Sequence, residues 1–303
     1  MQKYCIYSNE YVDESELNKE HIIPKKLGGQ LDFSVLVSKE INSQLGSKID
    51  APFVNDTFVQ LHSKSYNFKG HSKKVTPALK NSIIKETNEK VDISFKNNKM
   101  IFHKKWSKNS PAWTKTLEQC KAKVIECNFT MSQDIYVRFF AKLLLATGYY
   151  LYGDTFVQYG YHEDLRKVMN ADKVDKIIDD PSLKIKILSS FKNPDAFMHI
   201  VTSDFEAFKN YHVIWSSFYT NAVVLGVSFF GNKFLSANCI ISDNPEKFDI
   251  AGKGKVILKE LSTDSPRRLI KVTQEDLLIK FAETYIPDFN ISKIIKLANK
   301  NNS

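Results

Sequence analysis

The spacing of apolar residues changes along the chain and predicts several kinds of element. Between residues 132 and 152 apolar side chains recur at helical spacing, and the Gly153-Asp154 pair ends the run. This spacing predicts one helix of about five turns. The apolar positions that define it are Ile135, Phe139, Leu143, Leu144 and Ala146.

Beyond this helix, runs rich in β-branched and aromatic residues predict an antiparallel sheet. The turn dipeptide Gly231-Asn232 separates two of these runs. A helix should follow the sheet, because Thr273 and Asp276 have the spacing of a capping box. The predicted strands are Phe197–Thr202, Tyr211–Ser217, Ala222–Phe230, Lys233–Ile241 and Lys255–Lys259.

The first part of the chain differs in composition and in the length of its predicted elements. Residues 1–60 contain short elements between glycines, whereas residues 61–112 are polar and rich in lysine. In the lysine-rich stretch, Val91–Phe95 and Met100–Phe102 predict a β-hairpin. We therefore predict an α+β protein in three parts: a compact core at 1–60, a basic linker with a hairpin at 61–112, and an α+β domain with an antiparallel sheet at 113–303.

Positive charge is concentrated in one segment of the chain. The net charge is +9, yet residues 51–125 hold 15 lysines against 5 acidic residues, and residues 126–303 are nearly balanced. Such a basic stretch is typical of proteins that bind polyanions, because each phosphate that a lysine neutralises releases counterions. A solvated lysine-rich face is the alternative explanation. The candidates for phosphate contact in this segment are Lys73, Lys74, Lys104 and Lys105.

Cysteine usage favours an intracellular protein. The four cysteines are widely spaced, and none belongs to a C-x-x-C pair. The sequence has no apolar leader with a cleavage site and no uncharged run near the ~20 residues that span a bilayer. We expect a cytoplasmic protein that does not enter a membrane.

The candidate chemistry lies in Glu20-His21-Ile22-Ile23-Pro24-Lys25-Lys26-Leu27-Gly28-Gly29. An acidic residue and a histidine close an apolar strand, and a proline and two glycines then turn the backbone. The stretch Val35–Asp50 follows, with Asn42 and a G-x-x-I-D sequence inside it. This order of segments resembles the HNH endonuclease family, whose ββα-metal core opens with D/E-H-I-x-P-x-x-x-G-G. The resemblance covers about the first sixty residues.

The resemblance implies hydrolysis of DNA phosphodiester bonds with Mg²⁺ or Mn²⁺ as cofactor. His21 suits the general base, because histidine titrates near neutral pH. Glu20 and Asn42 offer oxygen ligands of the kind that Mg²⁺ prefers, and Asn42 is also a candidate catalytic residue. Asp50 lies about two helical turns beyond Asn42 and is either a further ligand or a structural residue. Lys25 and Lys26 are candidates for nucleic-acid binding.

The chain departs from zinc-binding relatives at two C-x-x-C pairs. Here the first pair reads Cys5-Ile6-Tyr7-Ser8 and the second reads Ser38-Lys39-Glu40-Ile41. One cysteine cannot complete a tetrahedral zinc site, so we expect no structural zinc. The apolar residues expected to pack in place of the metal are Tyr4, Ile6, Leu36 and Ile41.

A second departure concerns the middle asparagine of the family, which steadies the base histidine. Its position falls on Phe33 or Ser34, and Ser34 or Asp32 would have to substitute for it. Two functions fit these observations. One is an endonuclease, in restriction or phage defence, whose C-terminal domain serves target choice, homodimer formation or regulation. The other is a nucleic-acid-binding protein on a core that has lost catalysis, and RNA stays open as the substrate or partner in place of DNA.

Overall fold

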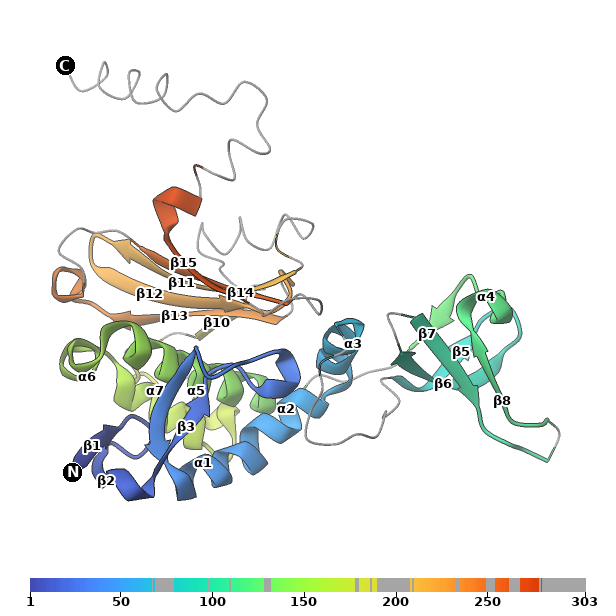
Figure 1. The fold of residues 1–303 in the computed structure, drawn as a ribbon, viewed down its shortest axis with the longest axis horizontal. Helices are drawn as coiled ribbons and strands as arrows, with labels where there is room; N and C mark the ends of the chain where they lie inside the picture. Colours follow the sequence, from blue (N-terminus) through green and yellow to red (C-terminus); the bar gives the residue numbers. More distant parts are fainter. Residues whose placement is uncertain are drawn as a thin grey trace, which may run out of the picture. The chain divides into compact units, whose positions relative to one another are not determined.

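The computed structural model of the protein describes residues 1–66, 68, 79–96, 99–108, 110–127, 132–177, 180–185, 187–189, 208, 210–232, 235–248, 254–261, 268–277 and 279. They belong to two compact units, Met1–Ile187 with Leu261–Arg267, and Leu188–Glu260 with Arg268–Ser303 (Figure 1). The expected division into residues 1–60, 61–112 and 113–303 stays a prediction, and the long helix that follows residue 113 lies in the first unit. Helices and antiparallel sheets occur together, which confirms the α+β class.

The first unit opens with the order of elements that a ββα core requires. Strand β3 (Leu17–His21) pairs antiparallel with β4 (Ser34–Ser38), and helix α1 (Lys39–Leu45) follows at once. A short antiparallel hairpin precedes them, made of β1 (Gln2–Cys5) and β2 (Glu10–Asp13). The remaining short elements of this segment are η1 (Glu14–Glu16), η2 (Lys25–Leu27), the π-helical turn η3 (Gly46–Asp50), α2 (Ala51–Asn55) and α3 (Thr57–Ser65).

Side chains of β3 and β4 point alternately to the two faces of the hairpin, and this alternation determines which of them are buried in the core. Glu20 pairs with Val35 across the two strands, so these two residues share one face, and both are buried. His21 pairs with Ser34, and both are half-buried. Because successive strand residues point to opposite faces, Glu20 projects into the core while His21 projects from the other side.

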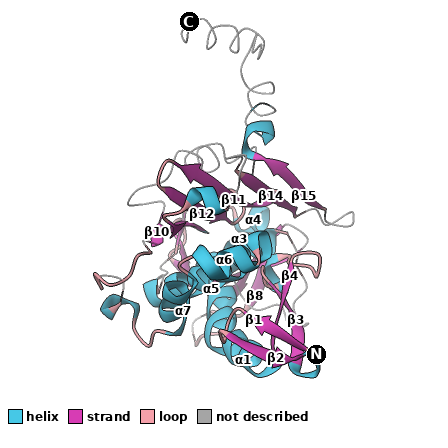
Figure 2. Ribbon diagram, turned by 90° about the vertical axis from the view of Figure 1, so that its left-hand side faces the viewer, coloured by secondary structure: helices cyan, strands magenta, loops and turns pink. Residues whose placement is uncertain are grey.

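The long helix α5 (Gln133–Tyr152) confirms the prediction from apolar spacing. Ser132 caps it, since the Ser132 hydroxyl accepts a hydrogen bond of 3.5 Å from the backbone N–H of Ile135. The helix packs on the ββα segment through Phe139, whose ring stacks on Phe53 of α2 with centroids 3.6 Å apart. Helices α6 (Asp154–Tyr159) and α7 (His162–Asn170) lie against α5 (Figure 2), and the short helix η4 (Val174–Lys176) follows.

The basic segment forms a small sheet and not only the expected hairpin. Five strands lie in the order β8-β7-β6-β5-β9 and enclose an apolar cluster that includes Ile93 and Phe102. The expected hairpin is its centre, where β6 pairs with β7. The bounds are β5 (Leu79–Ile84), β6 (Glu89–Lys96), β7 (Lys99–Lys104), β8 (Trp113–Thr116) and β9 (Ile125–Glu126), with the short helix α4 (Leu117–Cys120) between β8 and β9.

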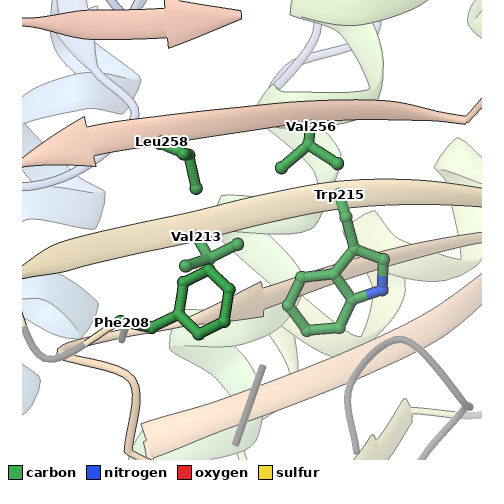
Figure 3. Close-up of a cluster of buried hydrophobic side chains, with 5 residues drawn as sticks. All are labelled: Phe208, Val213, Trp215, Val256 and Leu258. Carbon is green, nitrogen blue, oxygen red and sulfur yellow. The ribbon is translucent and has the colours of Figure 1, made fainter. Parts of the chain in front are cut away.

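The second unit contains a six-stranded sheet in the order β10-β13-β12-β11-β14-β15. One face carries an apolar cluster around Trp215 (Figure 3). Gly226 lies directly beneath the Trp215 ring, where a Cβ atom would come within 2.1 Å of the indole, so only glycine fits. The strands are β10 (Ile187–Ser189), β11 (Tyr211–Tyr219), β12 (Ala222–Ser228), β13 (Ser236–Ser242), β14 (Lys255–Glu260) and β15 (Leu269–Thr273), and a short helix η6 spans Pro245–Lys247.

Four of the five predicted strands of this sheet are confirmed, and Phe197–Thr202 lies outside the described residues. The predicted cap is also present, because the backbone N–H of Asp276 donates to the Thr273 hydroxyl at 3.0 Å. Among the residues that the structure describes, no helix is both long enough and apolar enough to cross a membrane.

Candidate active site

His21 lies at the end of β3, where the backbone makes a tight turn. The N–H of Ile22 still pairs with the carbonyl of Phe33 at 3.1 Å, and the chain then leaves the sheet at Pro24. Gly28 has a φ of +92°, which an L side chain rarely adopts. A Cβ atom on Gly29 would lie 1.6 Å from the Ile23 carbonyl oxygen. The G-G pair of the motif is therefore required by the backbone that presents His21.

Glu20 and Asp50 converge, but on a lysine of α5. The Lys142 ammonium donates to Glu20 Oε1 at 2.6 Å and to Asp50 Oδ2 at 2.5 Å. The Lys142 side chain is only 4% exposed, and the aromatic ring of Tyr7 lies 5.6 Å from its Nζ. Two of the three expected metal ligands thus form a buried ion-pair triad with a residue outside the ββα segment.

The triad changes the protonation equilibria of its members. Burial raises the pKa of Asp50 to about 6, although the Lys142 charge opposes the rise. Burial alone would lower the pKa of Lys142, but the two carboxylates outweigh it and raise that pKa. Lys142 is therefore charged at neutral pH. Burial also raises the pKa of Tyr7 well above its usual value, and the nearby Glu20 and Asp50 carboxylates add to the rise.

Asn42 lies on α1 and contacts β3 at a different point. Its side-chain amide donates to the Asn18 side-chain oxygen at 3.0 Å. Asn18 shares the face of β3 that carries Glu20, because the two residues are two positions apart. Asn42 is thus on the Glu20 side of the strand, and its side chain hydrogen-bonds another amide and not Glu20.

The position of the family's middle asparagine falls on Phe33 or Ser34, and the first of these is an aromatic core residue. Phe33 is buried, and its ring meets Tyr150 of α5 edge-to-face with centroids 4.8 Å apart. The Ser34 hydroxyl donates to the carbonyl of Leu31 at 2.8 Å, so its proton is committed to the loop. The Asp32 side chain is exposed, and its backbone carbonyl accepts from the Tyr150 hydroxyl at 3.4 Å.

The expected ligand set does not fit a divalent metal in this arrangement. Glu20 and Asp50 direct one oxygen each at the Lys142 ammonium, which already supplies a positive charge between them. Mg²⁺ keeps several water molecules when it binds to proteins, and a pocket that leaves Lys142 only 4% exposed gives them little access. Within the described part of the chain, no cluster of three or more histidine, cysteine, aspartate or glutamate residues is placed to hold a metal.

The two segments that would hold zinc in relatives lie side by side, and Arg166 of α7 hydrogen-bonds the turn between β1 and β2. Cys5 Sγ accepts a hydrogen bond from the Ser38 N–H at 3.3 Å, so the two former C-x-x-C segments are adjacent. Arg166 donates to the carbonyl of Ile6 at 2.9 Å and to the Asn9 side chain at 3.4 Å. Of the apolar residues expected to replace the metal, Ile6 is fully buried, whereas Tyr4, Leu36 and Ile41 are half-buried.

The lysines expected to bind nucleic acid have different surroundings. Lys25 is exposed, and Lys26 donates to the Asn55 side chain at 3.2 Å, both directly after the His21 strand. Lys104 forms an ion pair with Glu89, and Lys105 forms one of 3.0 Å with Asp92. Two of the five acidic residues of the basic segment therefore lie beside these two lysines. Lys73 and Lys74 lie outside the described residues.

The sequence interpretation missed Lys142, Arg166 and Tyr150. All three come from helices α5 and α7, far from the motif in the sequence. One signal was available for Lys142, because it is a lone charge inside the apolar run Phe139-Phe140-Ala141-Lys142-Leu143-Leu144-Leu145. Such a charge on a helix that is apolar all round predicts a buried partner of opposite sign.

The segment that carries His21 is similar to a known protein family. Residues 5–58 match the HNH endonuclease family. This segment is therefore similar to an HNH domain. Neither a curated protein nor a solved structure matches the chain. The match includes His21, Glu20, Asn42 and Asp50, and it indicates a nuclease-type function acting on nucleic acid. Lys142, which binds two of these residues, lies outside the matched HNH segment.

The purified protein is expected to contain no stoichiometric zinc. Cys5 is the one cysteine among the four former ligand positions, and serine and isoleucine do not hold zinc tetrahedrally. Elemental analysis of the protein purified without chelators measures this directly. A content near one zinc per chain would contradict the expectation and would point to ligands elsewhere.

Asp50 is expected to make stability depend on pH. Its pKa in the folded protein, about 6, exceeds the ordinary value of 3.8, so the folded state binds more protons between these values. Stability from this group is therefore present at pH 4 and is lost as the pH rises through 6. Urea denaturation of wild type and Asp50→Asn should show the wild type losing free energy of unfolding, relative to the variant, over this window. A difference that stays constant from pH 4 to pH 7 would contradict the raised pKa.

Proposed function

We propose that this protein is an endonuclease that hydrolyses phosphodiester bonds in DNA at the end of β3, with His21 as general base. The observation that carries the proposal is the position of His21. It is the one histidine of the matched HNH segment, and it projects from a strand end that the two glycines fix. A half-buried imidazole keeps part of its surface accessible to a water molecule and a phosphate.

The residues around His21 have separable roles in this reaction. His21 accepts a proton from the attacking water, whose oxygen bonds to the phosphorus atom while the bond from phosphorus to the leaving oxygen breaks. The leaving oxygen then takes a proton from solvent. Lys25 and Lys26 follow four and five residues later and bind the phosphate backbone by charge. The buried ion pairs of Lys142 with Glu20 and Asp50 fix the end of β3 from the core side. RNA is an alternative substrate, because the proposal identifies no residue that distinguishes a 2′-hydroxyl.

Restriction or phage defence is the biological setting we propose, and it rests on the resemblance to HNH endonucleases alone. The Mg²⁺ or Mn²⁺ requirement of such enzymes stays a prediction, to be tested with both metals. For residues 113–303 we keep target choice, homodimer formation and regulation as roles to test. Size-exclusion chromatography of the isolated protein tests the homodimer.

A second candidate function is nucleic-acid binding without cleavage. Two observations favour it: Phe33 and Ser34 stand where the family's middle asparagine is expected, and Lys142 binds the carboxylates of Glu20 and Asp50. A gel-shift assay and a plasmid-nicking assay on the same preparation separate the candidates. Binding together with nicking in Mg²⁺ or Mn²⁺ supports the endonuclease, whereas binding without nicking under any of these conditions supports the second function.

Lys25 and Lys26 are expected to supply part of the salt-dependent affinity. Each lysine that neutralises a phosphate adds about 0.9 to the slope of log K against log salt on duplex DNA. The double variant Lys25→Glu and Lys26→Glu should therefore bind all sequences more weakly and with a flatter slope. Lys104→Glu and Lys105→Glu form the matched control, because Glu89 and Asp92 already pair with these lysines. A larger loss of slope in the control variant would place the phosphate-binding surface on the basic sheet instead.

A further inference from the structure

We propose that Lys142 is an internal cation that takes the place of a divalent metal between Glu20 and Asp50. The proposal concerns the same segment as the proposed nuclease function, since it rests on the assignment of Glu20 and Asp50 as expected metal ligands. Lys142 of α5 supplies the positive charge that balances these two carboxylates. Wild-type protein therefore holds no divalent ion at this pair.

The geometry supports an exchange of one cation for another. The Lys142 ammonium contacts both carboxylates, at 2.6 Å and 2.5 Å, although Glu20 and Asp50 come from β3 and the π-helical turn η3. Their oxygens thus surround one central positive atom, which is how carboxylates are arranged around a bound metal. The ring of Tyr7 closes the site on a further side, at 5.6 Å from Nζ.

One oxygen of the site has no partner of its own. Asp50 Oδ1 is buried and makes no hydrogen bond in the structure. A buried carboxylate oxygen without a donor is costly, and lysine has only three protons to share. A divalent ion with a water molecule would satisfy more lone pairs than the ammonium does. One carboxylate oxygen of the pair, Asp50 Oδ1, is thus left without a hydrogen bond, as expected where an ammonium stands in place of a metal.

Charge balance explains why the two cations exclude each other. Two carboxylates with one ammonium leave a single negative charge, and a divalent ion would have to share the site with a neighbouring positive charge. The ammonium cannot easily move away, because α5 is held in place by aromatic packing such as the stack of Phe53 on Phe139. Removing the lysine charge, and nothing else, should therefore open the pair to a metal.

Manganese binding tests the inference without any measurement of cleavage. Mn²⁺ is titrated into wild type, Glu20→Gln, Lys142→Met and the double variant Lys142→Met with Asp50→Asn, and the free ion is followed by electron paramagnetic resonance. We expect wild type and Glu20→Gln to bind Mn²⁺ equally. Lys142→Met should gain one site per chain that binds at least about tenfold more tightly than any wild-type site, a difference of about 1.4 kcal/mol. The additional Asp50→Asn change should remove that site.

Two results would overturn the inference. One is a stoichiometric Mn²⁺ site in wild type that Glu20→Gln removes, because the carboxylates would then bind metal beside the lysine. The other is a folded Lys142→Met protein that gains no site. If Lys142→Met does not fold, Lys142→Gln is titrated in its place. If neither variant folds, the comparison of wild type with Glu20→Gln decides. A protein without nuclease activity can still pass this test, so its failure is distinct from failure of the proposed function.

Discussion

Replacing His21 with alanine is expected to abolish DNA cleavage while DNA binding stays nearly intact. A general base contributes roughly 10²- to 10⁴-fold to a hydrolysis rate, so the loss should be at least about a hundredfold. Binding should change little, because affinity for DNA comes mainly from lysines distributed over the surface. Single-turnover cleavage measures the rate, and a gel shift on the same DNA measures binding.

The matched control for this variant is His62→Ala. His62 lies on α3, outside the matched segment, and its ring packs beside Phe58 with centroids 4.6 Å apart. Its loss removes a half-buried imidazole without touching the end of β3. Cleavage by His21→Ala at the wild-type rate would exclude His21 as the base. Equal losses in the two histidine variants would indicate a defect of folding and not of chemistry.

Lys142→Met is expected to cause the largest loss of stability among the variants considered. Removing one partner of a buried ion pair costs about 3–5 kcal/mol, because a charge is left inside without compensation. Here two carboxylates, Glu20 and Asp50, would lose their shared cation. Urea denaturation followed by the helical circular dichroism signal measures the effect on the first unit, since helices α1 to α7 belong to it.

Two controls show whether the cost comes from the buried charges. In the triple variant Lys142→Met, Glu20→Gln, Asp50→Asn no charge stays buried in the triad, so most of the loss should be recovered. Lys167→Met removes an exposed ammonium that lies 3.5 Å from the Asp164 carboxylate, and this change should cost no more than about 1 kcal/mol. A Lys142→Met protein as stable as the Lys167 control would contradict the triad that the structure shows.

Local patterns in the sequence predicted the elements that depend on local physics. The helix at 133–152 followed from apolar spacing and from the Gly153-Asp154 pair that ends it, and the strands around Gly231-Asn232 followed from β-branched runs. The ββα order at the N-terminus followed from the resemblance, together with the glycines that the tight turn after His21 requires. The small sheet at 79–126 was seen only as a hairpin, because its outer strands are short and polar.

The contacts that complete the candidate site could not be predicted in the same way. Lys142 lies 122 residues from Glu20 and 92 from Asp50, and no periodic pattern connects such distant positions. Arg166 donates to the backbone carbonyl of Ile6, and a carbonyl is present at every residue, so the sequence does not indicate this partner. Motif matching could assign Glu20 and Asp50 to a metal because it reads residue types. Only packing shows which cation they face.

A plasmid-nicking time course with wild-type protein tests the central claim most directly. Supercoiled DNA is incubated with fractions across the final chromatography peak, in Mg²⁺ and in Mn²⁺, and the nicked and linear forms are quantified over time. The account predicts cleavage whose rate follows the protein concentration across the peak in at least one metal, and which is absent from the His21→Ala peak. DNA that stays supercoiled under every condition while the protein binds it would contradict the endonuclease assignment.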